Sequence, residues 1–384
     1  MKTVCSYNAC TGCMACINVC PKNAISILDD LISYNAEISD EKCIGCGLCE
    51  NMCPNINFRV LQEPIYWKQG WASESIRSKS SSGGAASAII RRFIEDGGYV
   101  ASCLFIDGEV GFRVTNDLNV AKRFAGSKYV KSNPGTVYND VKRLIRAGEK
   151  VLFIGLPCQS AAVQNVCEDN GNLFTADLIC HGTPSPKILK QFIRERGIDW
   201  ESISDIKFRE SEIFGVEIDG IRITPRRVQD SYLRLFLNSV DYTENCYACR
   251  YAASVRVSDI TLGDAWGQLS DTVSGGVSLI LCQTQKGKEL VENAGLHLEE
   301  VDLDKAIQAN HQLKRPSVMH PGRGKFFNEI KAGRSIRRAT VSIMPKESIK
   351  QSIKTGLIKL HLVKDFTSRG GGYSMTVIFK SIRD

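Results

Sequence analysis

The sequence lacks any stretch suited to a membrane or to export. No apolar run in its 384 residues approaches the roughly 18 that a membrane-spanning helix needs. The first residues, MKTVCSYN, contain no apolar core of a signal peptide. We therefore expect a soluble protein of the cytoplasm. The chain is long enough for two or three domains, and its 24% charged and 43% hydrophobic residues are ordinary for globular proteins.

Two common nucleotide-binding motifs are missing as well. No G-x-G-x-x-G follows a predicted strand, so the usual dinucleotide fingerprint is absent. No G-x-x-x-x-G-K-[ST] occurs, so the loop that holds transferable phosphates is absent too. Direct use of NAD(P)H and phosphoryl transfer are therefore disfavoured.

The body of the chain has no excess of positive charge. The net charge is +7, but residues 331–384 hold twelve Lys or Arg and three Asp or Glu, a local +9. The other residues therefore sum to −2 (7 − 9). A basic tail on a nearly neutral body does not favour nucleic-acid binding, and we expect no nucleic-acid partner.

Cysteine, by contrast, is abundant, with 16 residues. In a chain of a reducing compartment this number indicates metal sites and not disulfides. Two runs share the spacing C-x2-C-x2-C-x3-C-P, and the second repeats the first at an offset of 33 residues. The two runs are Cys10, Cys13, Cys16 and Cys20, followed by Pro21, and Cys43, Cys46, Cys49 and Cys53, followed by Pro54.

This repeat is the pattern of the two-cluster bacterial ferredoxins. Three thiolates of each run hold one 4Fe-4S cluster, and the fourth ligates the other cluster, so the ligands cross over. A pair of zinc knuckles is the alternative, but zinc needs only pairs of cysteines and no fourth cysteine before a proline. We assign cluster one to Cys10, Cys13, Cys16 and Cys53, and cluster two to Cys43, Cys46, Cys49 and Cys20.

The hydrophobic pattern predicts an α+β fold. After the ferredoxin-like unit, residues 61–70 look like a connector, and strands then alternate with helices to about residue 200. From 203 onward the pattern is strand-rich. The predicted elements are a helix after Gly84, strands 99–106 and 110–115 around an Asp107-Gly108 turn, a helix at 138–147, strands 151–155 and 173–180, and helices at 186–196, 286–294 and 304–310.

Four later cysteines lie in contexts that suggest a third site. Cys158 follows a predicted buried strand at the start of a helix, where free amides favour a thiolate. Cys180 ends another apolar strand, and Cys246 and Cys249 form a C-x2-C pair. We infer a third iron–sulfur cluster on these four residues. Zinc on the C-x2-C pair, beside two unrelated buried cysteines, is an equally good explanation of the spacing alone.

The other cysteines look structural. Cys103 and Cys282 fall inside apolar strands and Cys167 lies late in a helix, which is typical of buried packing residues. Cys5 precedes the repeat, and we expect it to be a bystander and not a ligand.

Several other residues are candidates for binding or catalysis. Ser82, Gly83 and Gly84 open a helix, where free N–H groups suit a cofactor phosphate, although a plain N-cap explains them equally well. Lys128 follows a glycine turn, a position that a solvated surface lysine also takes. His181 directly follows Cys180 and is a candidate proton donor, or a residue that only hydrogen-bonds its surroundings.

The basic tail contains one amphipathic stretch. Over residues 345–366 the apolar Ile349, Ile353, Leu357 and Leu360 line one face of a predicted helix, and lysines lie mostly elsewhere. Such a helix could contact a membrane surface or an acidic partner, or simply pack on the protein itself.

Taken in order, SSGGAAS, GSKYV, VLFIGLPCQSAAV, DLICHGTPSP, the C-x2-C pair and SDITLGDAWG resemble the coenzyme F420 hydrogenase/dehydrogenase beta-subunit family. The resemblance runs from about residue 1 to 330, with the ferredoxin unit fused at the start. It implies a flavoprotein, with FAD or FMN beside an iron–sulfur cluster. Carried over, it favours Cys158, Cys180, Cys246 and Cys249 as ligands and Ser82, Gly83, Gly84 and Lys128 around the flavin.

The expected organisation is therefore a ferredoxin-like two-cluster domain fused to a mixed α/β flavin-binding domain. We expect a dicluster domain at 1–60, the N-terminal flavin-binding part at 61–155, a C-terminal part with the third site at 156–330, and the basic tail at 331–384. The family is diverse, and the CHGTPSP wording most resembles bacterial members associated with surface-polysaccharide pathways.

The expected function is that of an oxidoreductase. Ferredoxin-type clusters collect single electrons from a ferredoxin or another donor, and a flavin pairs them for a small-molecule or sugar-nucleotide substrate. One alternative is a deazaflavin (coenzyme F420) oxidoreductase. Another is an electron-transfer subunit that docks on a catalytic partner, with the basic tail as a docking surface.

Overall fold

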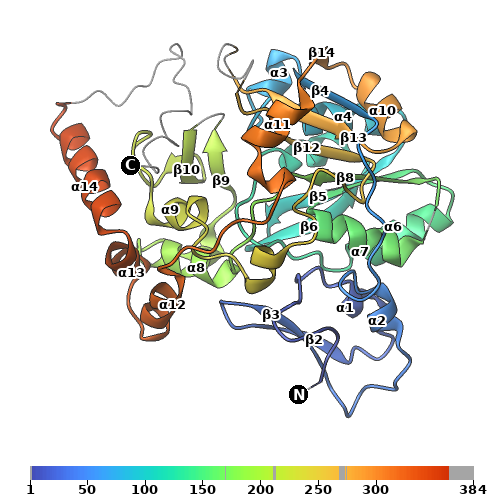
Figure 1. The fold of residues 1–384 in the computed structure, drawn as a ribbon, viewed down its shortest axis with the longest axis horizontal. Coiled ribbons are helices and arrows are strands. Elements are labelled where there is room, and N and C mark those ends of the chain that lie inside the picture. Colours follow the sequence, from blue (N-terminus) through green and yellow to red (C-terminus); the bar gives the residue numbers. More distant parts are fainter. Residues whose placement is uncertain (1, 169, 211–212, 268–272, 274, 363–384) are drawn as a thin grey trace.

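The computed structural model describes residues 2–168, 170–210, 213–267, 273 and 275–362 (Figure 1). Its centre is an eight-stranded sheet with the spatial order β14-β4-β13-β12-β8-β7-β5-β6. The strands are β4 (Tyr66–Trp71), β5 (Tyr99–Ile106), β6 (Glu109–Thr115), β7 (Val151–Gly155), β8 (Leu173–Leu178), β12 (Ile260–Asp264), β13 (Ser278–Cys282) and β14 (His297–Glu299).

Strand direction places several loops at one edge of this sheet. Strands β5, β7, β8 and β12 are parallel neighbours. Strand β4 runs the same way, because β4 and β12 are both antiparallel to β13. The carboxyl ends of all five strands therefore lie at the same edge, where ligands of open α/β sheets usually bind.

Helices cover both faces of the sheet. Helices α4 (Ala85–Glu95) and α10 (Gln285–Glu292) pack on the face that includes Ile154, and α6 (Val137–Arg146) and α7 (Pro157–Cys167) pack on the face that includes Phe153. Adjacent residues of β7 thus serve opposite layers, as strand geometry requires. The mixed α/β architecture predicted from the sequence is confirmed.

The hairpin of β5 and β6 is confirmed, but the connector predicted at 61–70 is wrong. Asp107 and Gly108 both have positive φ, as a tight hairpin turn requires. Residues 66–71 form β4, which pairs with both β13 and β14. This strand was not predicted because its sequence, YWKQGW, contains polar residues and a glycine. A Cβ at Gly70 would lie 2.2 Å from the His297 carbonyl oxygen, so close pairing with β14 excludes a side chain there.

The ferredoxin-like unit lies beneath α6 and α7 (Figure 1, blue). Tyr138 Oη donates a 2.9 Å hydrogen bond to the carbonyl oxygen of Cys13, and Asn165 Nδ2 donates to that of Asn57. Both contacts tie the unit to the central domain. Its elements are β1 (Lys2–Thr3), α1 (Ala15–Val19), β2 (Ile25–Asp29), β3 (Tyr34–Ile38) and α2 (Leu48–Met52), with the sheet order β1-β3-β2.

A second, smaller module stands beside the central domain. Its core includes Phe192, Phe208, Tyr232 and Phe326, all fully buried. It consists of β9 (Ile206–Glu210), β10 (Ile213–Ile218) and β11 (Ile221–Arg222), with α8 (Pro186–Arg194), α9 (Ser231–Leu237), α12 (Arg323–Lys331), α13 (Ile336–Ile343) and α14 (Pro345–Lys359).

The remaining helices are short connectors of the central domain: α3 (Glu74–Arg77), α5 (Leu118–Ala121) and α11 (Leu303–Ala309). Among the described residues, no helix combines the length and the apolar character that crossing a bilayer requires.

Candidate functional site

Four of the repeat cysteines line one small pocket in the ferredoxin-like unit. All four side chains are buried, and three come from the first motif while the fourth comes from the second. These are the residues assigned to cluster one: Cys10, Cys13, Cys16 and Cys53. A four-thiol lining with one ligand from the other motif is the donor set of a 4Fe-4S cluster, so the residues fit the group.

The loop geometry of this pocket favours bound thiolates. Gly12 and Met14 adopt positive φ, which bends the chain so that its amides turn toward the cysteines, and Gly12 N–H lies 3.4 Å from Cys10 Sγ. The pKa of Cys10 falls to about 7, chiefly through a hydrogen bond with Cys5. Burial raises the pKa of Cys13 well above its ordinary value. A bound metal would supply the charge that stabilises the Cys13 thiolate.

Cys5 lies in the same pocket, although we expected it to be a bystander. Its Sγ is 3.8 Å from Asn55 Nδ2, and its thiol is the main cause of the lowered pKa values of Cys10 and Cys53. The sequence offered no sign of this, because Cys5 precedes the repeat by five residues. The prediction that Cys5 is not a ligand stays a prediction.

The cysteines assigned to cluster two lie nearer the surface. Cys20, Cys43 and Cys49 pack against the apolar core of the ferredoxin-like unit, whereas Cys46 is exposed. Ala24 N–H lies 3.3 Å from Cys20 Sγ. The repeat therefore has a buried set of thiols that faces the central domain and a set that reaches solvent.

The third predicted site lies at the carboxyl edge of the central sheet. Cys158 is the second residue of α7, directly after β7, and Cys180 lies two residues beyond β8. Cys246 and Cys249 lie in and directly after a short 3-10 helix, Glu244–Ala248. Thr243 N–H donates a 3.0 Å bond to the Thr183 carbonyl oxygen, which ties this helix to the loop after Cys180.

These four cysteines influence one another's pKa values. Burial raises the pKa of Cys158, and Cys249, Cys180 and Cys246 raise it further. Burial likewise raises the pKa of Cys180 to about 12, again with contributions from Cys246 and Cys249. Cys158 and Cys249 also pack on the same small apolar cluster, with Tyr251. The assignment of one cluster to all four residues stays a prediction.

Local contacts explain how this loop is held. Gly182 has φ 136°, and a Cβ there would lie 2.3 Å from the ring of Tyr242, so only glycine lets the loop after Cys180 approach. Around Cys246 Sγ, Asn245 Nδ2 lies at 3.7 Å and Thr243 Oγ1 at 3.5 Å. Hydrogen bonds to a ligand sulfur are one means by which proteins adjust iron–sulfur potentials.

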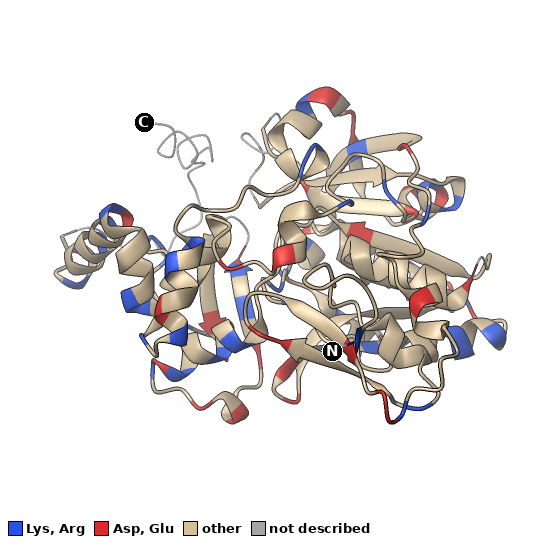
Figure 2. Ribbon diagram, turned by 60° about the horizontal axis from the view of Figure 1, so that its bottom comes forward, with Lys and Arg blue, Asp and Glu red and all other residues tan. Residues whose placement is uncertain are grey.

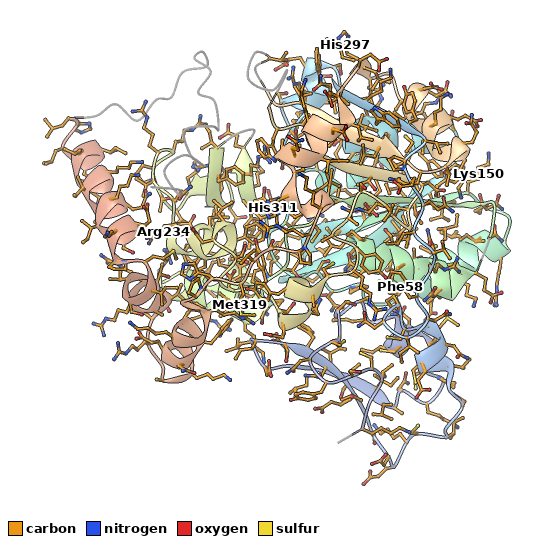
Figure 3. The ribbon with its side chains drawn as sticks, viewed as in Figure 1. Phe58, Lys150, Arg234, His297, His311 and Met319 are labelled. Atoms are coloured by element: carbon orange, nitrogen blue, oxygen red, sulfur yellow. The ribbon has the colours of Figure 1, made fainter. Side chains whose placement is uncertain are left out.

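The cluster-one pocket and the third site adjoin each other. Cys158 contributes to the raised pKa of Cys13, although burial is the main cause. Burial raises the pKa of the Tyr251 hydroxyl, and Cys158, Cys13 and Cys249 raise it further. The ring of Phe58, labelled in Figure 3, lies tilted against that of Tyr251, with 5.6 Å between the ring centres, where the ferredoxin-like unit meets the central domain.

The two motifs predicted to surround a flavin also meet. Ser127 N–H donates a 2.8 Å bond to Ser81 Oγ, which joins the GSKY turn to the loop before α4. A Cβ at Gly83 would lie 2.5 Å from the Gly70 carbonyl oxygen, so this loop lies directly against β4. Ser82 Oγ donates to the Val277 carbonyl oxygen, and Gly84 caps α4 with a φ of 84°.

Lys128 and His181 are both turned into the protein. Lys128 Nζ donates to the Phe124 and Ala125 carbonyl oxygens, and burial lowers its pKa. Burial lowers the pKa of His181 to about 4, so its ring is neutral at pH 7. Gln312 Nε2 lies 2.7 Å from His181 Nδ1, which then accepts and leaves the proton on Nε2. Neutral imidazole is a weak acid, so this geometry favours hydrogen bonding over proton donation at pH 7.

Three further observations complete the site. Cys167 and Cys282 are buried in apolar cores, as packing residues are. In the part of the chain that the structure describes, no three His, Cys, Asp or Glu side chains are grouped closely enough to hold a single metal ion. Arg209 forms a 2.6 Å ion pair with Asp264 at the end of β12, a pairing that the sequence pattern did not reveal.

Comparison with known proteins defines the class. Residues 9–56 match the 4Fe-4S dicluster domain. Residues 148–305 match the family described as the C terminus of the coenzyme F420 hydrogenase/dehydrogenase beta subunit. Residues 148–305 are therefore similar to the C-terminal part of the coenzyme F420 hydrogenase/dehydrogenase beta subunit, and a 4Fe-4S dicluster domain precedes them at residues 9–56, as the motifs indicated. The chain is an iron–sulfur electron-transfer protein related to these beta subunits.

The similarity to an individual solved structure is low. Among solved structures, one similar chain belongs to the F420-reducing NiFe hydrogenase complex from Methanosarcina barkeri, with 18% identity over 71% of this chain and 94% of that chain, at a TM-score of 0.48. No curated protein matches the sequence significantly.

Proposed function

We propose that this chain is an iron–sulfur flavoprotein oxidoreductase in which electrons pass singly through three clusters to a flavin. The observation that carries this proposal is the order of the cysteines in space. Cys46 is exposed, Cys13 lines a pocket of buried cysteines, and Cys158 contributes to the raised pKa of Cys13. The order gives an entry at cluster two, a relay at cluster one and an exit at the third site.

The flavin belongs at the carboxyl edge of the sheet. The Ser81–Ser127 contact joins the two motifs expected around the flavin, and Gly83 lies against Gly70 near the carboxyl end of β4, while Cys158 and Cys180 follow the carboxyl ends of β7 and β8. The loop before α4 offers helix amides to a phosphate, as many cofactor sites do. A bound flavin, FAD or FMN, would supply the ability to accept single electrons and release pairs. Ser82, Gly83 and Gly84 would hold the phosphate, and Lys128 would support the neighbouring turn.

The substrate is proposed by family resemblance alone. A small molecule or sugar nucleotide of a surface-polysaccharide pathway fits the CHGTPSP motif, and reduction or oxidation of a deazaflavin carrier is the alternative. Fold resemblance does not decide between them, because one fold supports many activities.

An anaerobic experiment on the purified protein tests this function. After chemical reduction, we expect the flavin absorption to bleach and to return when a small-molecule acceptor is added to the protein alone. Return only in the presence of a partner protein would identify an electron-transfer subunit instead. Clusters that reduce while no flavin signal responds would contradict the proposed route.

The electron donor should dock beside cluster two. Ile44 and Leu48 flank Cys46 and are 61% and 40% exposed. Exposed aliphatic residues around an exposed cluster suit a transient contact with a ferredoxin or a similar donor, because such interfaces are small.

The basic helix α14 is a second contact surface, and its apolar side faces outward. Ser348 and Gln351 pack against the protein, whereas Ile349 and Ile353 are 60% and 58% exposed. Residues 363–366 of the predicted helix lie outside the described residues. Figure 2 shows more Lys and Arg than Asp and Glu on the helices at this end. An apolar stripe beside lysines suits an anionic lipid surface, and a second copy would bring like charges together.

A vesicle experiment tests this surface. The full chain should sediment with vesicles of mixed phosphatidylglycerol and phosphatidylcholine, and not with phosphatidylcholine alone. Ile353→Ser should weaken vesicle binding about tenfold, because the variant lacks an aliphatic side chain that would be buried in the lipid surface on binding. Ile221→Ser, which removes an isoleucine 75% exposed on β11, is the matched control. Equal binding to both vesicle types, or no binding, would contradict an anionic lipid surface as the partner of α14. An acidic protein would then be the remaining candidate partner.

A further inference from the structure

Lys131 is a buried cation at the junction of the cluster-one pocket and the central domain. Its side chain is only 5% exposed. Its Nζ donates a 2.8 Å bond to the Thr11 carbonyl oxygen, inside the first cysteine loop, and lies 5.0 Å from the ring centre of Tyr34. A Cβ at Gly12 would lie 3.0 Å from the lysine stem, so that loop is folded directly over it.

Lys131 is also connected to the third site, through its own backbone N–H and through the side chain of Ser132. Lys131 N–H donates to the Pro184 carbonyl oxygen, in the loop that begins at Cys180. Ser132 Oγ accepts a 3.0 Å bond from Gln159 Nε2, and Gln159 directly follows Cys158. The side chain of Lys131 is thus bonded to the loop of the first cysteine motif, and its backbone is bonded to the loop after Cys180, so its charge lies beside both sites.

No carboxylate among the described residues forms an ion pair with this lysine. A buried charge is costly unless an opposite charge compensates it. Clusters held by four thiolates are net anions, and each gains a further negative charge on reduction. A cation fixed between two such sites therefore stabilises the reduced form of both, and it does so strongly because the surroundings are poorly screened.

We propose that Lys131 is a positioning residue for electron transfer, whose fixed charge raises the reduction potentials of cluster one and of the third cluster together. Electrons that enter at the exposed cluster two are thereby drawn inward. The proposal rests on the function proposed above, because it assumes that both sites hold clusters. Lys131 lies outside every cysteine motif, and it connects the cluster-one pocket with the third site.

Redox titrations followed by electron paramagnetic resonance test this role. Lys131→Met keeps the length of the stem without the charge, Lys131→Gln keeps a donor for the Thr11 carbonyl oxygen, and Lys131→Arg keeps the charge. We expect either neutral variant to lower the midpoints of cluster one and the third cluster. A tenfold weaker reduction equilibrium corresponds to about 59 mV for a one-electron couple. The arginine variant should stay near the wild type, and cluster two should shift least.

Lys150→Gln is the control for a lysine far from the clusters, since Lys150 is exposed and lies at the outer edge of the central domain in Figure 3. The proposal is overturned if a neutral variant that retains its iron leaves both midpoints unchanged, or if the arginine variant shifts them as much. If the wild type holds only about eight irons, the proposed third cluster is absent. The cluster-one midpoint still tests Lys131 in that case.

Discussion

Replacing Cys158 by alanine should remove about four irons from the protein and stop electrons at the ferredoxin-like unit. Cys158 is the second residue of α7 and is assigned to one cluster with Cys180, Cys246 and Cys249, so its loss leaves three thiolates for a four-iron cluster. Iron should fall from about twelve to about eight per chain. The spectrum of the two ferredoxin clusters should remain, and reduction of the flavin by a donor should be abolished.

Cys167→Ala is the matched control, because Cys167 ends the same helix and packs in an apolar core. It should keep all of its iron and differ only in stability, by about 1 kcal/mol for the lost side-chain volume. If the Cys158 variant keeps about twelve irons, the third site does not hold a cluster as assigned. Zinc bound at Cys246 and Cys249 would refute the assignment as well.

The second large effect concerns the crossed ligands of the repeat. Cys53 belongs to the second motif by sequence, but it lines the pocket of Cys10, Cys13 and Cys16. We therefore expect Cys53→Ala and Cys10→Ala to lose the same cluster. Each should lose about four irons, because a cluster with three protein thiolates is labile. The paramagnetic resonance spectra that remain should be alike in these two variants.

Cys20→Ala provides the reciprocal comparison, since it should match Cys43→Ala and not Cys10→Ala. Iron and sulfide analysis, with spectra of the dithionite-reduced proteins, distinguishes the two patterns. A Cys53 variant whose remaining spectrum matched that of the Cys43 variant would show that each motif closes its own cluster. Cys5→Ala tests the fifth thiol of the pocket and should retain all of the iron if Cys5 is not a ligand.

Much of the molecule could be predicted because its signals are local. Two cysteine runs with one spacing predicted the dicluster domain, and the alternation of apolar strands with helices predicted the mixed sheet. The position of Cys158 and Cys180 directly after two strands predicted that they would meet. Parallel strands place their carboxyl ends together whatever their distance along the chain.

Other features could not be predicted, because they depend on contacts between distant segments. Strand β4 has no alternating pattern and is specified by its pairing with β13 and β14. The sequence around Lys131 has no motif, and the position of this lysine between two sites depends on its contacts with Thr11 and Pro184, which are distant in the sequence. The exposed stripe of α14 was visible as a pattern, but the sequence did not show which side would pack.

The central claim is that three sulfur-bound clusters and one flavin share this chain. Quantitation of iron, acid-labile sulfide and flavin in protein purified without oxygen tests it most directly. We predict about twelve irons and one flavin per chain, counting three four-iron clusters. About eight irons and no flavin would leave only the dicluster domain. Colourless protein without cluster or flavin absorption would contradict the account entirely.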